Sequence, residues 1–209
     1  MRRAALLASG LLLLLAACRS ARPPAGEAIA PLTSTSPSEA AAQLARRRAD
    51  FSGVRSLVRI RIPNSMSARA ALEVDRQKAV TLTVFTPVGT TAARLHAAHD
   101  RISFEDDVHG TKWEGKASDF AGSYGIFGST LPTESIAELL VGLPPATLGS
   151  VTYAATGMQQ ATFGDVVVTY EPPVYPPRRV LIDRGERHVE IDYLGGQVAE
   201  PRSSTEKTP

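Results

Sequence analysis

Four histidines are the side chains of this sequence best suited to acid–base chemistry or metal binding near neutral pH: His96, His99, His109 and His188. None of them has the H-x-x-x-H spacing that places two imidazoles on one face of a helix. His96 and His99 stand three residues apart at the end of an expected strand, where this spacing directs them to different faces. We therefore expect structural or solvated histidines and no metal site.

Motifs for a nucleophile or for paired carboxylates are also missing. The G-x-S-x-G elbow is absent, since residues 122–125 do not fit its spacing. The acidic residues at expected strand ends, 105–107 and Asp183 with Glu186, have no pattern that fixes two carboxylates at a catalytic separation. A phosphate-binding glycine loop is absent too. The sequence predicts no catalytic residue, no cofactor and a protein that is not an enzyme.

Cys18 is the single cysteine, which excludes a disulfide within the chain and a thiolate metal cluster. It follows two arginines and the apolar run 4–17. As a helix this run would span about 21 Å, which is shorter than the roughly 30 Å hydrocarbon core of a bilayer. Residues 1–17 are therefore expected to be a signal peptide.

Residues 15–18, LAAC, resemble the bacterial lipobox, in which the cysteine receives diacylglycerol and becomes the mature N-terminus. The alternative is an ordinary Ala-x-Ala cleavage site with a chance cysteine. Because the one cysteine of the chain stands at this position, we expect Cys18 to be lipidated and to anchor the protein. Arg19, rather than Asp, follows it, which is similar to lipoproteins sent to the outer membrane of didermic bacteria.

The charge of the chain excludes a general polyanion-binding protein. The formal net charge of +2 comes from Arg2 and Arg3, and without them the chain has 21 basic and 21 acidic residues. Nucleic-acid binders cluster basic charge, whereas this chain has one short basic triplet, 46–48. We expect the triplet to be a solvated helix face, with contact to anionic lipid as the alternative.

The mature chain divides into a tether, one domain and a tail. Residues 18–37 are rich in Pro, Ala, Ser and Thr and predict a flexible tether. The domain is expected over 38–195, and a polar tail over 196–209. A helix is expected from Ser38, its N-cap, and a short amphipathic helix is expected over 133–143, ended by Gly142.

The remaining runs of the domain have a period of two, which is typical of strands with one dry and one wet face. Eleven such runs are expected, six before the helix over 133–143 and five after it. No helix interrupts the first six, so they predict antiparallel meander strands, and a sheet of this size must curl or close. Four expected inward positions are small, which leaves either a cavity for apolar ligands or a core filled by helices: Ala68, Ala70, Ala93 and Ala97.

Two further segments follow Cys18 in an order typical of a known family. They are LTVFTPVGTTAARL over 82–95 and ELLVGLPP over 138–145. With them, the chain resembles the LolB family of outer-membrane lipoprotein receptors, within the group that shares the LolA/LolB fold. The resemblance runs from about Phe51 to Leu194.

This resemblance implies a mainly β fold: a curled, unclosed antiparallel half-barrel of about eleven strands, covered by short helices. It implies an apolar cavity that accepts the acyl chains of lipoproteins from the periplasmic carrier LolA, and insertion of these lipoproteins into the outer membrane without ATP or metal. A protruding turn is implicated in insertion, and Pro87, Val88 and Gly89 occupy it here. The family commonly has a larger leucine at Val88. The sequence leaves open whether Val88 is exposed or tucked under the hairpin.

The dry strand faces and the second helix would supply the cavity and its lid. The expected residues are Val58, Ile60, Leu72, Val74, Leu82, Val84, Leu95, Ile136, Leu139, Leu140 and Leu143. The expected partners are a LolA-like carrier, lipoprotein acyl chains and outer-membrane lipid, with no nucleic acid. The expected protein is a monomer at the periplasmic face of the outer membrane. The alternatives are a lipid- or glycolipid-binding lipoprotein on the same scaffold, and a structural outer-membrane lipoprotein without cargo.

Overall fold

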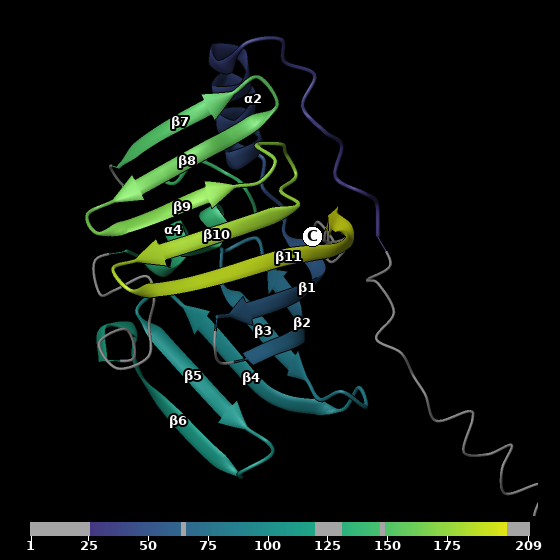
Figure 1. The fold of residues 1–209 in the computed structure, drawn as a ribbon, viewed down its shortest axis with the longest axis vertical. Coiled ribbons are helices and arrows are strands. Elements are labelled where there is room, and N and C mark those ends of the chain that lie inside the picture. Colours follow the sequence, from purple (N-terminus) through teal and green to yellow (C-terminus); the bar gives the residue numbers. More distant parts are fainter. Residues whose placement is uncertain (1–25, 64–65, 120–130, 147–148, 200–209) are drawn as a thin grey trace, which may run out of the picture.

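The computed structural model describes residues 26–63, 66–119, 131–146 and 149–199. Within these ranges, helix α2 comes before six strands, and helix α4 separates them from five more (Figure 1). The elements are α2 Pro37–Ala49, β1 Val54–Ile62, β2 Met66–Val74, β3 Val80–Phe85, β4 Thr91–Ala98, β5 Arg101–Asp106, β6 Thr111–Lys116, α4 Thr133–Leu140, β7 Ser150–Ala154, β8 Gly157–Phe163, β9 Val166–Tyr170, β10 Arg179–Arg184 and β11 Arg187–Ala199.

All eleven strands form one antiparallel sheet in the order β6-β5-β4-β3-β2-β1-β11-β10-β9-β8-β7. Strands adjacent in sequence pair with each other, except β6 and β7, and β1 also pairs with β11, which joins the two halves. Strands β6 and β7 are the two ends of the described sheet, which is therefore not closed into a barrel. The predicted fold class and the division into six and five strands are confirmed.

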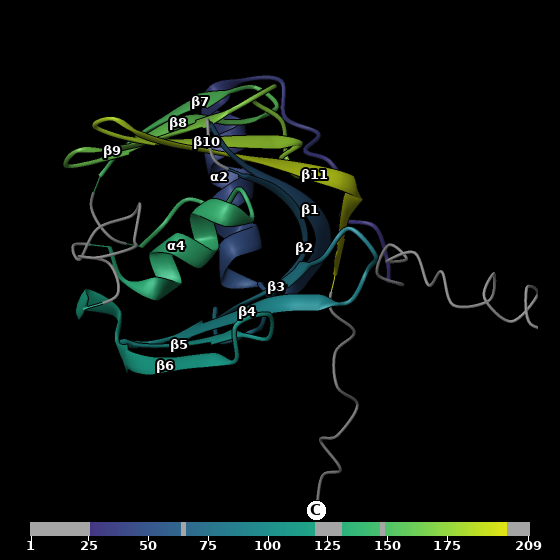
Figure 2. The ribbon, with the colours of Figure 1, turned by 60° about the horizontal axis from the view of Figure 1, so that its bottom comes forward.

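The junction of the two halves of the sheet contains a bulge. The β1–β11 register shifts between Ser56 and Val58, opposite a segment of β11 that contains Gly195 and Gly196. Both glycines have positive φ, 90° and 86°, a conformation that other residues rarely adopt. Such a bulge bends its strand and increases the local twist. Figure 2 shows the result: the sheet wraps around α2 and α4, which lie on its concave side.

The N-cap of helix α2 lies two residues before the predicted one. Ser36, not Ser38, is the N-cap, and its hydroxyl accepts a hydrogen bond from the backbone N–H of Glu39 at 3.3 Å. Pro37 occupies the first turn, where its missing N–H costs no helical hydrogen bond. Ala40 and Leu44 are the buried residues of this helix, and α2 packs on β7 and β8.

The folded part extends beyond the predicted boundaries at both ends. Ala28 bridges Val198, and the N–H of Ile29 donates to the carbonyl of Gln197 at 3.1 Å. Strand β11 reaches Ala199, and Gln197 is buried. Residues assigned from sequence to the tether and to the tail are thus hydrogen-bonded to each other. The pairing was not visible locally because it joins segments about 170 residues apart.

Of the basic triplet at the end of α2, Arg46 is exposed as predicted, whereas Arg47 and Arg48 are partly buried and make contacts within the fold, which corrects the prediction for these two. Arg47 lies 4.8 Å from the ring centroid of Tyr175 and donates to the carbonyls of Ala30 and Pro31. Arg48 pairs with Glu138 on α4. Two of the three arginines therefore hold the helix to other parts of the fold.

Candidate functional site

Helix α4 occupies the concave side of the sheet through an apolar surface. Ala137, Leu139 and Leu140 are buried, and the helix is followed by Gly142, whose φ of 78° allows the chain to turn there as predicted. The hydroxyl of Tyr170 donates to the carbonyl of Leu139 at 2.9 Å, and the hydroxyl of Tyr193 donates to that of Leu140. Burial raises the pKa of both tyrosines, so their hydroxyls stay protonated and able to donate.

Glu138 is the charged residue of α4 that faces inward, and only 1% of it is exposed. Its carboxylate accepts a hydrogen bond from Arg48 Nε at 2.7 Å and another from Lys78 Nζ. The backbone N–H of Ala146 also donates to it, at 3.0 Å. One buried carboxylate therefore ties α4 to α2 and to the β2–β3 turn, and its charge is balanced by two cations.

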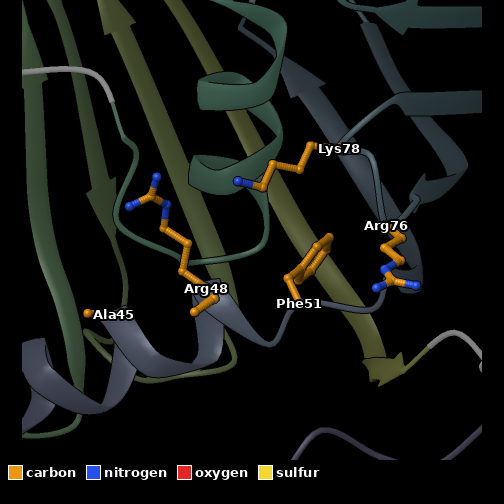
Figure 3. A pocket seen from close by; sticks show the side chains of 6 residues that line it. Ala45, Arg48, Phe51, Arg76 and Lys78 are labelled. Carbon is orange, nitrogen blue, oxygen red and sulfur yellow. The ribbon is translucent and has the colours of Figure 1, made fainter.

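A cavity of about 430 Å³ opens beside this cluster at the end of α2. Figure 3 shows Arg48 reaching up from α2 and Lys78 reaching across from the β2–β3 turn, so that both cationic groups lie beside α4. The lining comprises Ala45, Arg48, Ala49, Phe51, Arg76 and Lys78. This cavity is partly cationic, and none of the residues predicted to line an acyl cavity lines it.

The eleven residues predicted to form the cavity and lid lie together, in one hydrophobic cluster. Six are buried in it: Val58, Leu72, Val74, Leu139, Leu140 and Leu143. Five are partly buried against it: Ile60, Leu82, Val84, Leu95 and Ile136. These residues therefore share one apolar core, and their role as an acyl-chain cavity and lid stays a prediction.

The concave face remains partly uncovered over β3 to β6. Leu82 of β3 pairs with Leu95 of β4, Leu95 with Phe104 of β5, and Phe104 with Trp113 of β6. Directly paired residues point to the same face, so these four form one apolar row across the sheet. Phe104 is partly buried and Trp113 is 36% exposed. Neither aromatic was among the site residues predicted from the sequence, although both alternate with charged residues along their strands, which is the signal that could have found them.

The β3–β4 turn carries Val88 at its tip with 81% of the residue exposed. Pro87 and Gly89 are exposed as well, and Gly89 has a φ of 87°. A backbone hydrogen bond closes the turn: the N–H of Thr86 donates to the carbonyl of Thr90 at 2.8 Å. Val88 is therefore a side chain on a well-defined turn and not a part of the core.

The histidines lie apart and pair with neighbouring side chains. His96 contacts Thr81, His99 contacts Glu134, His109 contacts Asp106, and His188 contacts Asp183. The hydrogen bond to Asp183 raises the pKa of His188 despite its partial desolvation.

In the described ranges, no three His, Cys, Asp or Glu side chains are grouped as metal ligands. No helix in these ranges is long and apolar enough to span a membrane. Cys18 lies outside the described residues.

Comparisons with known proteins found similarity among solved structures. A LolA superfamily protein from Nitrosomonas europaea aligns with a TM-score of 0.41 and 9% identity, over 78% of this chain and 94% of its own. The lipoprotein LppX from Mycobacterium tuberculosis aligns with a TM-score of 0.31 and 14% identity, over 73% of this chain and 92% of its own. No protein-family model and no curated protein matches the chain. At these scores the alignments carry no functional argument, so the fold assignment rests on the hydrogen-bond register of the chain itself.

Proposed function

We propose that this protein is a LolB-like lipoprotein receptor: a lipid-anchored protein at the periplasmic face of the outer membrane that accepts lipoproteins from a LolA-like carrier and inserts them into that membrane. It binds their acyl chains on the concave face of the sheet. It catalyses no covalent reaction and uses no cofactor or metal. Its anchor is the lipid on Cys18.

The observation that carries this proposal is the exposure of Val88. An apolar side chain at the tip of a hydrogen-bonded turn has no role in the core and suits entry into the acyl boundary of a bilayer. The Pro87–Val88–Gly89 turn is also the segment that the resemblance associates with insertion. The partly uncovered apolar row on the concave face supports the binding of an uncharged chain.

The test is transfer of a lipoprotein from LolA to lipid vesicles by the mature chain, residues 18–209. Arrival of the lipoprotein in the vesicles only when the protein is present supports the proposal. Failure to accept cargo from LolA rejects it. Removal of cargo from LolA without delivery would leave binding intact and reject the insertion step.

The cationic cavity favours a second candidate, a lipid-binding lipoprotein on the same scaffold. Arg76 lies at its wall, and Arg48 and Lys78 together carry one positive charge more than the single carboxylate of Glu138 that they share. This excess of positive charge suits a lipid with an acidic head group, whereas a lipoprotein acyl chain needs no such contact. Lipid that co-purifies with the mature chain, combined with no acceptance of cargo from LolA, would favour this candidate. If the mature chain neither co-purifies with lipid nor accepts cargo from LolA, the result would favour a structural lipoprotein.

A further inference from the structure

We propose that the cavity at the end of α2 is a binding site for a phosphate monoester, held by Arg48, Arg76 and Lys78. Such a site goes beyond the receptor function, because the transfer of acyl chains requires no anion. It also gives the second candidate, a lipid-binding lipoprotein, a defined head group. The site stands independently of lipoprotein transfer, since it depends only on the charges and the shape of this cavity.

The buried carboxylate of Glu138 holds two of the three cations in position. Arg48 donates to it from Nε at 2.7 Å, and Lys78 donates to it from Nζ. These bonds use one of the five N–H donors of the guanidinium and one of the three donors of the ammonium group. The remaining donors are therefore presented beside α4 by side chains that are already ordered. Such side chains lose little conformational freedom when a ligand binds.

Arg76 is the cation of the cavity that does not share Glu138. It is exposed and lines the cavity from the β2–β3 turn, and its guanidinium makes no ion pair within the described ranges. In Figure 3 it lies on the other side of Phe51 from the other two cations. Of the side chains of Arg48 and Lys78, 33% and 23% are exposed, so a solute can reach all three cations.

The charge of the cavity matches a phosphate monoester better than a singly charged anion. Three cations against the one carboxylate of Glu138 leave an excess of two positive charges. The carbonyl end of α2 offsets about half a charge of this excess. Asp50 and Asp75 do not line the cavity, and the carboxylate of Asp75 accepts the N–H of Ala79 at 2.8 Å. A phosphate monoester carries about −1.5 to −2 at pH 7 and so neutralises the excess, whereas a carboxylate carries one charge.

The size and the apolar part of the lining favour an ester over inorganic phosphate. The cavity of about 430 Å³ falls in the range of small-molecule sites and is larger than a phosphate group needs. Phe51, Ala45 and Ala49 supply its apolar lining. The organic group of an ester would pack against these side chains while the phosphate contacts the cations. A phospholipid with a monoester head group and a soluble phosphate ester present the same chemistry here.

Isothermal titration calorimetry of the mature chain, residues 18–209, with three soluble probes tests the site. Glycerol 3-phosphate carries the monoester alone, dihexanoyl phosphatidic acid carries it on a lipid, and dihexanoyl phosphatidylcholine is the matched lipid with a zwitterionic head group. We expect saturable binding of both monoesters, weakened by added sodium chloride because the contact is ionic. Phosphatidic acid should bind at least tenfold more tightly than phosphatidylcholine, whose binding through apolar contacts alone should not respond to salt.

Arg76→Gln should weaken the binding of both monoesters about tenfold, since it removes charge-assisted hydrogen bonds to the phosphate. The substitution should leave the urea midpoint unchanged, because the side chain is exposed and does not share Glu138. The matched control is Arg46→Gln, which alters an exposed arginine at the same end of α2 that does not line the cavity. This control should bind both monoesters as the wild type does.

The site is overturned if neither monoester binds. Equal affinity for the two lipids, or an equal loss in Arg76→Gln and Arg46→Gln, would also overturn it, because binding would then not depend on this cavity. Binding of phosphatidic acid alone would retain the site and assign it to a lipid head group. Equal affinity for the two monoesters would retain it and assign it to a soluble ester.

Lipoprotein transfer from LolA is measured separately, so the two proposals can fail independently. Monoester binding without transfer would retain the site and reject the receptor function. Transfer without monoester binding would reject the site and retain the receptor function.

Discussion

Arg48 of α2 donates a hydrogen bond from its Nε to the buried carboxylate of Glu138 on α4 at 2.7 Å, across 90 residues of sequence. Lys78 donates to the same carboxylate from the β2–β3 turn. The two helices that fill the curled sheet are therefore joined to each other and to the sheet by a single side chain.

Glu138→Gln should destabilise the protein by about 1–3 kcal/mol, because it leaves two cations without their counter-charge. The effect stays below that of a fully buried pair, since 33% of the Arg48 side chain and 23% of the Lys78 side chain are exposed to water. Urea unfolding measures it. Glu134→Gln, at a more exposed position on the same helix that contacts His99, is the control and should stay within about 0.5 kcal/mol. Equal stability of both variants would show that the cluster does not hold α4.

Val88→Glu should change the free energy of unfolding by no more than about 0.5 kcal/mol, because the side chain is exposed. The melting temperature should therefore stay nearly unchanged. It should abolish delivery of lipoprotein into vesicles, since a carboxylate resists entry into hydrocarbon. Acceptance of cargo from LolA should persist. Val108→Glu, on the neighbouring exposed turn, is the matched control and should deliver cargo normally. Unchanged delivery by Val88→Glu would remove the insertion role from this turn.

Cys18→Ala should accumulate as an unprocessed precursor, because a lipobox without its cysteine offers no site for the diacylglyceryl group. Immunoblotting and membrane fractionation measure this. Normal processing together with normal membrane partition would contradict lipidation. A variant cleaved and released before Arg19 would indicate an ordinary signal peptide.

Asp192 should contribute to stability at neutral pH and lose this contribution in acid. Burial by itself raises the pKa of its carboxyl group, but hydrogen bonds from Arg179 and Arg61 outweigh burial and lower it overall. Since the pKa is lower in the folded than in the unfolded state, the stabilisation is present above the unfolded value of about 3.9 and is lost as the pH falls through the folded value. Asp192→Asn should therefore be less stable than the wild type at pH 7, and the difference should shrink below pH 4. Urea midpoints measured across this pH range test it, and a constant difference would contradict the assignment.

The sequence by itself determined the elements and the faces of the sheet. The alternation of Val58 and Ile60 with Arg59 and Arg61 predicted a strand with one dry face, and such patterns predicted eleven strands, six before the helix α4 and five after it, as observed. Gly142 marked the end of the second helix correctly. These predictions succeed because the period of a strand and the φ of a glycine are properties of a few adjacent residues.

Only the tertiary structure decided which residues meet across the sheet and which helices fill it. The pairing of Arg48 with Glu138, the docking of residues 27–29 on β11 and the row that ends at Trp113 all depend on the curl and on the register of strands distant in sequence. The exposure of Val88 was decided in the same way, since a turn of that sequence can either protrude or fold under its hairpin. A local pattern assigns each side chain to a face, whereas its neighbours on that face are set by long-range packing.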